Sequence, residues 1–235
     1  MEKMVVLNHK SCLTYDEVKN YIKNIKDKIR TDLNVIMIPS MCYLPLFNGK
    51  YNFKLGSQNI SFCNGTGEVK ADQLKSLGVS YVLIGHSERR SIFGEDDSMI
   101  NLKIKYSIEN GITPIVCIGE SFIDRERKKT QEVLLRQLKS ALLDVDVDND
   151  IVIAYEPVWA IGTDKIPTKD EISEVVSMIK NSILRKYNKD VKVLYGGNVN
   201  YENISMLLDI PLLDGFLIGR VGIDVDKITK LMNFI

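Results

Sequence analysis

Short apolar runs alternate with longer amphipathic segments along the whole chain, which is typical of βα units arranged around a parallel sheet. Several of the runs are rich in β-branched residues, as strands are. The candidate strands are residues 4–7, 35–38, 53–55, 81–84, 113–117, 151–155, 191–195 and 216–218. Eight parallel strands close a (β/α)8 barrel. The pattern therefore predicts an α/β fold of that architecture.

Two helix starts carry their own sequence signature. Thr14 is followed three residues later by Glu17, and Thr168 by Glu171, which is the spacing of a capping box. Within residues 172–183, apolar side chains recur at intervals of three and four. This spacing predicts a helix with one face packed on the barrel wall.

Composition excludes several classes of protein. The 31 basic and 31 acidic side chains cancel, so the chain carries no charge signature for nucleic acid or an anionic membrane. Its 4 cysteines form no CxxC pair, which favours reduced thiols and a cytoplasmic location over a disulfide framework or a zinc site. No apolar stretch is long enough for a signal peptide or a membrane span. Without linkers or repeats, we expect one domain over residues 1–235.

Polar residues follow the candidate strands almost everywhere, and in a closed parallel barrel these positions open on one face. Lys10, His86 and Glu156 would then converge there from three different strands. A carboxylate base, an imidazole and a fixed ammonium suit proton transfer next to a carbonyl. Glycine-rich turns after the last two strands offer backbone amides to a phosphate. Each feature alone also has an ordinary structural explanation.

Residues 157–167 directly follow the candidate base and are bracketed by prolines. They include Trp159, Ile161 and Gly162, so the segment is a candidate lid whose apolar tip would exclude water. An ordinary βα loop is the alternative.

Long segments of the chain match one family in order. They read GHSERR at 85–90, AYEPVWAIGT at 154–163 and YGG at 195–197, with QN at 58–59, TGE at 66–68, CIGE at 117–120 and DGFL at 214–217. In these segments the chain resembles triosephosphate isomerases. The resemblance implies a TIM barrel and an isomerase of glycolysis and gluconeogenesis that interconverts D-glyceraldehyde 3-phosphate and dihydroxyacetone phosphate. It implies an enediol(ate) intermediate, with no metal and no organic cofactor.

The resemblance also implies five catalytic roles. Glu156 would be the general base that moves the proton alpha to the carbonyl, and His86 would polarise that carbonyl as a neutral imidazole. A helix N-terminus would lower the pKa of His86. Lys10 would supply fixed positive charge, Asn8 a nearby hydrogen bond, and Glu88 would orient Lys10.

Further roles in binding and in lid movement follow from the same resemblance. Backbone amides would bind the substrate phosphate at Gly162, Asn198, Gly219 and Arg220. Ile161 and Leu217 would keep Glu156 dry, which makes a carboxylate a stronger base. Ser87 would hold Glu156 in the open state, and Tyr195 would latch the closed lid. Glu120 would partner Trp159.

The chain departs from the family pattern at three places. His9 lies between two catalytic positions, and strand alternation should point it away from the site, into packing or an interface. Asn198 and Arg220 stand where the family commonly has Ser and Gly, and we expect the Arg220 side chain to point to solvent. The loop at 60–65 is shorter than the one that reaches into the partner subunit in the family, so the expected homodimer would be weakened.

These departures leave two alternatives to a triose phosphate substrate. Changes at Asn198 and Arg220 would suit an isomerase of a related sugar phosphate, such as a four-carbon ketose phosphate. A barrel that binds a phosphometabolite without catalysis is the other, and it is disfavoured because all five candidate catalytic residues are present.

Overall fold

The computed structural model describes residues 2–47, 49–147, 150–163 and 165–235. Met1 at the start of the expected domain and Asp164 within the expected lid lie outside these residues, as do Asn48, Asp148 and Asn149.

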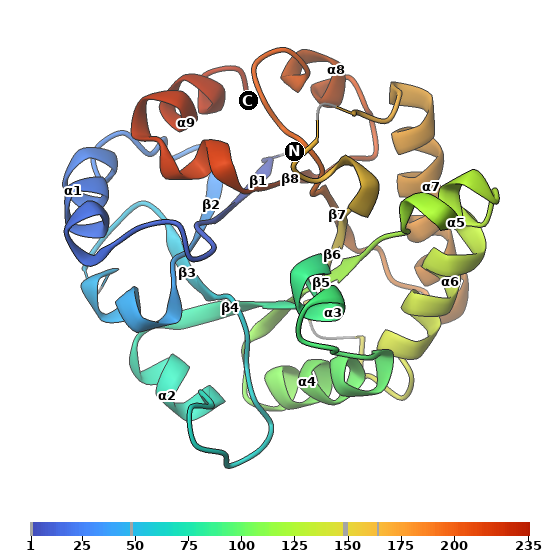
Figure 1. Ribbon diagram of the computed structural model, residues 1–235, viewed down its shortest axis with the longest axis horizontal. Coiled ribbons are helices and arrows are strands. Elements are labelled where there is room, and N and C mark those ends of the chain that lie inside the picture. The colour runs from blue at the N-terminus through green and yellow to red at the C-terminus, as the bar shows by residue number, and fades with distance from the viewer. Residues whose placement is uncertain (1, 48, 148–149, 164) are drawn as a thin grey trace.

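Within the described residues, parallel strands form a closed barrel in chain order from β1 to β8 (Figure 1). The strands are β1 (Met4–Asn8), β2 (Asn34–Ile38), β3 (Lys54–Ser57), β4 (Val79–Ile84), β5 (Thr113–Ile118), β6 (Val152–Tyr155), β7 (Lys192–Tyr195) and β8 (Gly215–Ile218). β1 pairs with both β2 and β8 and so closes the sheet. Each candidate run lies on one of these strands with its ends shifted by two residues at most, and the predicted barrel is confirmed.

Helices surround the barrel on its outside (Figure 1). They are α1 (Tyr15–Ile25), α2 (Ala71–Ser76), α3 (Ser87–Ser91), α4 (Asp97–Glu109), α5 (Phe122–Glu126), α6 (Thr130–Ala141), α7 (Lys169–Tyr187), α8 (Ile204–Leu208) and α9 (Val225–Met232). The 3₁₀ turns in the described residues are η1 (Met41–Phe47), η2 (Val158–Ala160) and η3 (Arg220–Ile223). None of the described helices combines the length and apolar character that crossing a membrane requires.

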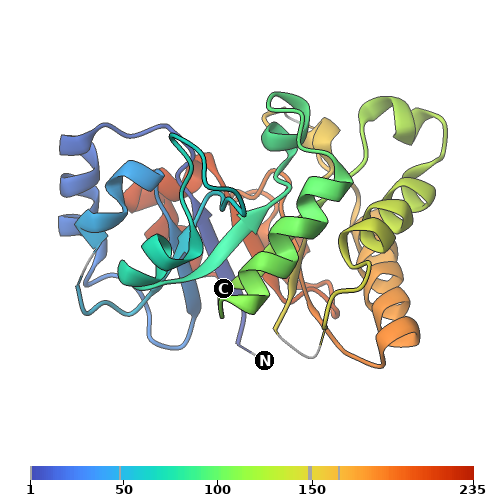
Figure 2. The same cartoon turned by 90° about the horizontal axis from the view of Figure 1, so that it is seen from below.

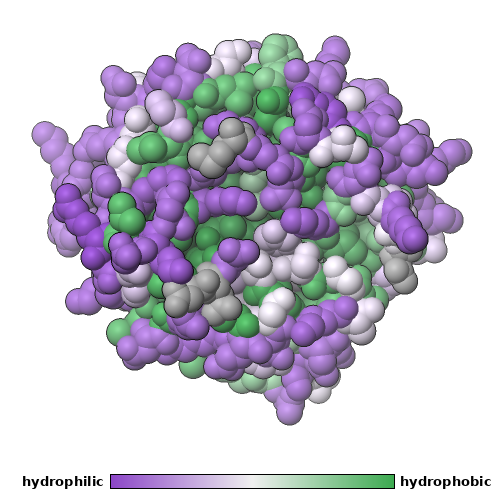
Figure 3. Space-filling model, turned by 180° about the vertical axis from the view of Figure 1, so that it is seen from behind, coloured by the Kyte–Doolittle hydropathy of each residue, from purple (hydrophilic) through white to green (hydrophobic). Residues whose placement is uncertain are grey.

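The strands read as continuous apolar runs because both of their faces are buried. On β1, Val6 belongs to the cluster inside the barrel, while Val5 and Leu7 pack outward against the helices. All three side chains are fully buried. Hydrophilic side chains cover much of the outer surface, as the view from behind shows (Figure 3).

The two predicted capping boxes mark the starts of α1 and α7. The Glu17 carboxylate accepts a hydrogen bond from the Thr14 N–H at 2.8 Å, and Glu171 accepts one from the Thr168 N–H at 2.8 Å. Thr168 Oγ1 in turn accepts from the Glu171 N–H at 3.3 Å. α7 therefore begins at a fixed point just after the candidate lid. Figure 2 shows α3 and the segment after β6 at the same end of the barrel, opposite the N-terminus.

Candidate active site

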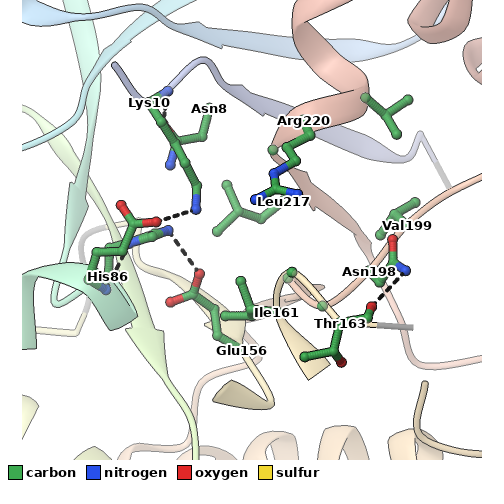
Figure 4. A pocket seen from close by; sticks show the side chains of 16 residues that line it. Asn8, Lys10, His86, Glu156, Ile161, Thr163, Asn198, Val199, Leu217 and Arg220 are labelled. Carbon is green, nitrogen blue, oxygen red and sulfur yellow. Dashed lines mark hydrogen bonds and ion pairs between the residues drawn. The ribbon is translucent and has the colours of Figure 1, made fainter. Parts of the chain in front are cut away.

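A pocket of about 330 Å³ lies at the carboxyl ends of the strands (Figure 4). All five candidate catalytic residues line it, as do all four candidate phosphate-binding residues and two of the lid and support residues. These are Asn8, Lys10, His86, Glu88 and Glu156; Gly162, Asn198, Gly219 and Arg220; and Ile161 and Leu217. The remaining candidates, Ser87, Glu120, Trp159 and Tyr195, are not among the residues that line the pocket.

Glu156 follows β6 and is 3% exposed. One carboxylate oxygen accepts a hydrogen bond from the Ser87 N–H at 3.0 Å, and the other lies 3.3 Å from His86 Nε2. Space beside it depends on Gly196, because a Cβ there would come within 2.9 Å of Glu156 Cγ. The carboxylate is thus held by two donors at the wall of the pocket.

His86 stands at the start of α3, and its hydrogen bonds define its tautomer. Nδ1 accepts from the Glu88 N–H at 3.2 Å, so that nitrogen carries a lone pair and no proton. In the neutral ring the proton is then on Nε2, which faces Glu156. The residue presents a neutral N–H donor to the pocket.

Lys10 has a left-handed backbone with φ of 51°, which costs a non-glycine residue about 1 kcal/mol. Its N–H donates to Asn8 Oδ1 at 2.9 Å. Its carbonyl oxygen accepts from Ser40 Oγ and from Gln58 Nε2, both at 2.7 Å. These three contacts come from the ends of β1, β2 and β3 and hold the strained backbone in place.

Glu88 binds the Lys10 ammonium at 2.5 Å and so fixes where the charge lies. Burial raises the pKa of Glu88, but the hydrogen bond and the positive charge of the Lys10 ammonium lower it, and the result is a pKa below the ordinary value. Glu88 is therefore an ionised partner for Lys10 at neutral pH.

The candidate lid, residues 157–167, is joined to the barrel through Trp159. Its indole N–H donates to Glu120 at 2.7 Å, and Glu120 also accepts from the Tyr155 hydroxyl at 3.2 Å. Burial raises the pKa of Glu120, opposed by these hydrogen bonds. Arg125 lies 4.1 Å above the Trp159 ring and forms an ion pair with Glu171 of α7.

Gly162 lies at the tip of the lid with φ of +70°, a conformation that suits glycine. In the described part of the chain, the N–H groups of Gly162, Asn198 and Gly219 have no hydrogen-bond acceptor. They are free to bind an anion in the pocket that they line. The Asn198 side chain itself donates to the Thr163 carbonyl at 3.3 Å and so connects the turn after β7 to the lid (Figure 4).

Arg220 is exposed to solvent, as expected, but it does not point away from the site. Its side chain lines the pocket and extends over it from the end of β8 (Figure 4). The expected exposure is observed, and because the turn after β8 faces the pocket mouth, the exposed side chain also lines the pocket.

Two predicted positions lie behind the site. His9 is buried against the rings of Tyr21 and Phe47, with centroids at 4.6 Å and 6.2 Å, and burial lowers its pKa to about 4. It occupies a packing position, one of the two roles expected for it. Tyr195 is fully buried, and its hydroxyl has no partner among the described residues.

The sequence analysis did not identify Ser40 or Arg125 as parts of the site. Gln58 was expected at the polar rim of the barrel, but its contact with Lys10 was not predicted. Ser40 lies just after β2, at the same rim. Nothing in the sequence marks Arg125. No cluster of His, Cys, Asp and Glu suited to a metal ion occurs in the ranges that the structure describes.

Comparison with known proteins gives a consistent result. The model of the triosephosphate isomerase family matches residues 3–235. A triosephosphate isomerase of Thermoanaerobacter sp. (strain X514) is 41% identical over 229 residues, which cover 92% of this chain and 91% of the relative. The corresponding protein of Mycoplasmopsis pulmonis is 36% identical over 249 residues, covering 100% of this chain and 98% of the relative.

Proposed function

Because the chain belongs to the triosephosphate isomerase family, we infer that it is an aldose–ketose isomerase that interconverts D-glyceraldehyde 3-phosphate and dihydroxyacetone phosphate. One observation carries the mechanism: the Glu156 carboxylate, the neutral His86 N–H and the Lys10 ammonium all face one pocket. This set combines a base, a donor for the carbonyl oxygen and a fixed cation, which together move a proton next to a carbonyl. Neither a metal nor an organic cofactor enters this mechanism.

Glu156 is the general base of the proposed reaction. Both of its oxygens face donors, the Ser87 N–H and His86 Nε2, and such donors weaken a base. Substrate binding would release Glu156 from Ser87, so that it takes the proton alpha to the carbonyl and returns it to the neighbouring carbon. His86 Nε2–H then donates to the substrate oxygens, and Lys10 stabilises the enediolate charge while Asn8 donates nearby.

The lid completes the site in this proposal. Closure brings the Gly162 N–H onto the substrate phosphate, together with the amides at Asn198, Gly219 and Arg220. Ile161 and Leu217 line the same pocket as Glu156, and closure of the lid would remove water from the carboxylate. The Tyr195 hydroxyl has no hydrogen-bond partner among the described residues, so it is available to bind the lid in its closed state. The hydrogen bond from Trp159 to Glu120 would guide the lid as it closes.

We further propose a cytoplasmic homodimer that serves glycolysis and gluconeogenesis. Four free thiols, of which only Cys117 is buried, support a reducing compartment. Exposed Ile92 and Phe93 offer apolar surface for a partner, whereas the short loop at 60–65 weakens the contact. Analytical ultracentrifugation over a concentration series tests this, and a monomer at all concentrations would refute it.

The test of function is steady-state isomerisation of glyceraldehyde 3-phosphate coupled to a dehydrogenase, with a four-carbon ketose phosphate run in parallel. We expect kcat/KM on the triose to approach about 10⁸ M⁻¹s⁻¹, the range of diffusion-limited enzymes. In D₂O the product should carry deuterium at the carbon that receives the proton, because a carboxylic acid exchanges its proton with solvent. Faster turnover of the four-carbon sugar phosphate would contradict the proposed substrate. Absence of turnover on both substrates would contradict the proposal that the protein is an isomerase.

A further inference from the structure

We propose that the Arg220 guanidinium binds the substrate phosphate directly, as a side-chain addition to the backbone amides around it. This inference rests on the proposed function, and it names a side chain that would make the site specific for substrates with a phosphate group. Arg220 directly follows Gly219, whose N–H is one of the free amides of the pocket. Its side chain extends over that pocket from the end of β8 (Figure 4).

The two cations of the pocket differ in their partners. Lys10 is paired with Glu88 at 2.5 Å, so much of its charge is already balanced. Arg220 forms no hydrogen bond or ion pair through its side chain within the ranges that the structure describes. A guanidinium has five N–H donors in a planar fork that matches two oxygens of a phosphate. Those donors are available at the pocket mouth.

The charge of the pocket supports the same assignment. Among the described residues that line it, the ionisable ones are Lys10, His86, Glu88, Glu156 and Arg220. Since His86 is neutral and Lys10 is balanced by Glu88, these described residues without Arg220 would carry one net negative charge, on Glu156. A phosphate dianion would be repelled by that charge. Arg220 brings that sum to zero.

The position of Arg220 favours a phosphate over an extra hydroxyl group of a longer sugar. The reacting carbons must lie between Glu156, His86 and Lys10, whereas Arg220 stands beside the free amides at the ends of β7 and β8. A hydroxyl needs no positive charge, and a dianion does. At this place the backbone amides supply only partial charges. The guanidinium therefore adds a full positive charge and two donors in a fixed geometry.

The experiment measures inorganic phosphate binding by titration calorimetry at pH 8, together with kcat and KM on glyceraldehyde 3-phosphate. We expect R220Q to raise the dissociation constant of inorganic phosphate about tenfold and to raise KM by a similar factor. R220K, which keeps the charge and loses the fork, should fall between the wild type and R220Q. The salt dependence of kcat/KM should be shallower in R220Q, because a cation at the pocket mouth attracts an anionic substrate.

A matched control is R185Q, which removes the same charge from the exposed last turn of α7, at the end of that helix remote from the lid. It should leave phosphate binding and its salt dependence unchanged. Unchanged phosphate affinity in a folded R220Q would overturn the inference, and so would a loss confined to kcat/KM on the four-carbon ketose phosphate. An inactive wild type that still binds phosphate through Arg220 would overturn the proposed function alone, so the two failures are distinguishable.

Discussion

Lowering the pH should destabilise this protein through His9, a residue that the proposed chemistry does not use. The imidazole is 1% exposed, and both of its nitrogens lack a hydrogen-bond partner among the described residues. Its neighbours are the rings of Tyr21 and Phe47, which cannot compensate a positive charge as a carboxylate would. Burial therefore lowers the pKa of His9 from 6.5 to about 4 in the folded protein.

The sign and size of the effect follow from these two values. Between about pH 4 and pH 6.5 the unfolded chain binds a proton at His9 and the folded chain does not. Stability from this group is therefore complete above pH 6.5 and decreases as the pH falls toward 4. At about 1.4 kcal/mol for each pH unit within the window, we expect a loss of about 2 kcal/mol between pH 7.5 and pH 5.0.

The assay is urea unfolding of the wild type and of His9→Phe at both pH values. Other groups titrate in both proteins, so the difference between their pH effects isolates His9, even if Phe changes the packing. With a slope of about 2–3 kcal/mol per molar urea, the wild type should lose roughly 0.7–1 M more in midpoint than the variant. Equal pH effects in the two proteins would refute the reasoning, as would an NMR titration of folded His9 near pH 6.5.

Three further substitutions have defined expectations. Glu156→Asp should lower kcat by two or more orders of magnitude, because it shortens the side chain of the base. Inorganic phosphate affinity should change little, because the backbone amides of the phosphate site stay in place, and activity equal to that of the wild type would contradict the assigned base. Gln58→Ala should lower kcat/KM about tenfold in steady-state assays, since Lys10 loses one of the contacts at its carbonyl, and unchanged kinetics would show that Ser40 suffices. Gly162→Ala should raise KM, since alanine at φ +70° costs about 1 kcal/mol, and an unaltered KM would exclude strain at the lid.

The sequence predicts the barrel and most of the residues that line its pocket for a definite physical reason. Strands buried on both faces leave uninterrupted apolar runs, and the first polar residue after each run marks the open end of the barrel. The pattern places Lys10, His86 and Glu156 at this open end, whereas the phosphate-binding and lid residues were implied by the family resemblance. The distances between the side chains of Lys10, His86 and Glu156 were not predicted. The contacts of Glu156 with Ser87 and His86 depend on the register between strands that are far apart in the chain.

The family resemblance implied some side-chain contacts, such as those of Glu88 with Lys10 and of Glu120 with Trp159, but other contacts across the barrel have no sequence signal. The backbone of Arg220 was expected in the phosphate turn and its side chain in solvent, and no sequence pattern indicated that this exposed side chain also lines the pocket. The stacking of Arg125 on Trp159 likewise joins α5 to the lid over 34 positions, and no local pattern marks it. Such contacts depend on which helix packs beside which loop, and only the closed fold determines that.

The contacts of Lys10 also bear on how far catalysis depends on a second subunit. A left-handed lysine backbone persists only where its surroundings hold it, and here the holding groups are Asn8, Ser40 and Gln58 of the same chain. Glu88, again from this chain, fixes the ammonium. In the homodimer proposed above, the groups described here that position Lys10 would therefore all belong to the same chain as Lys10.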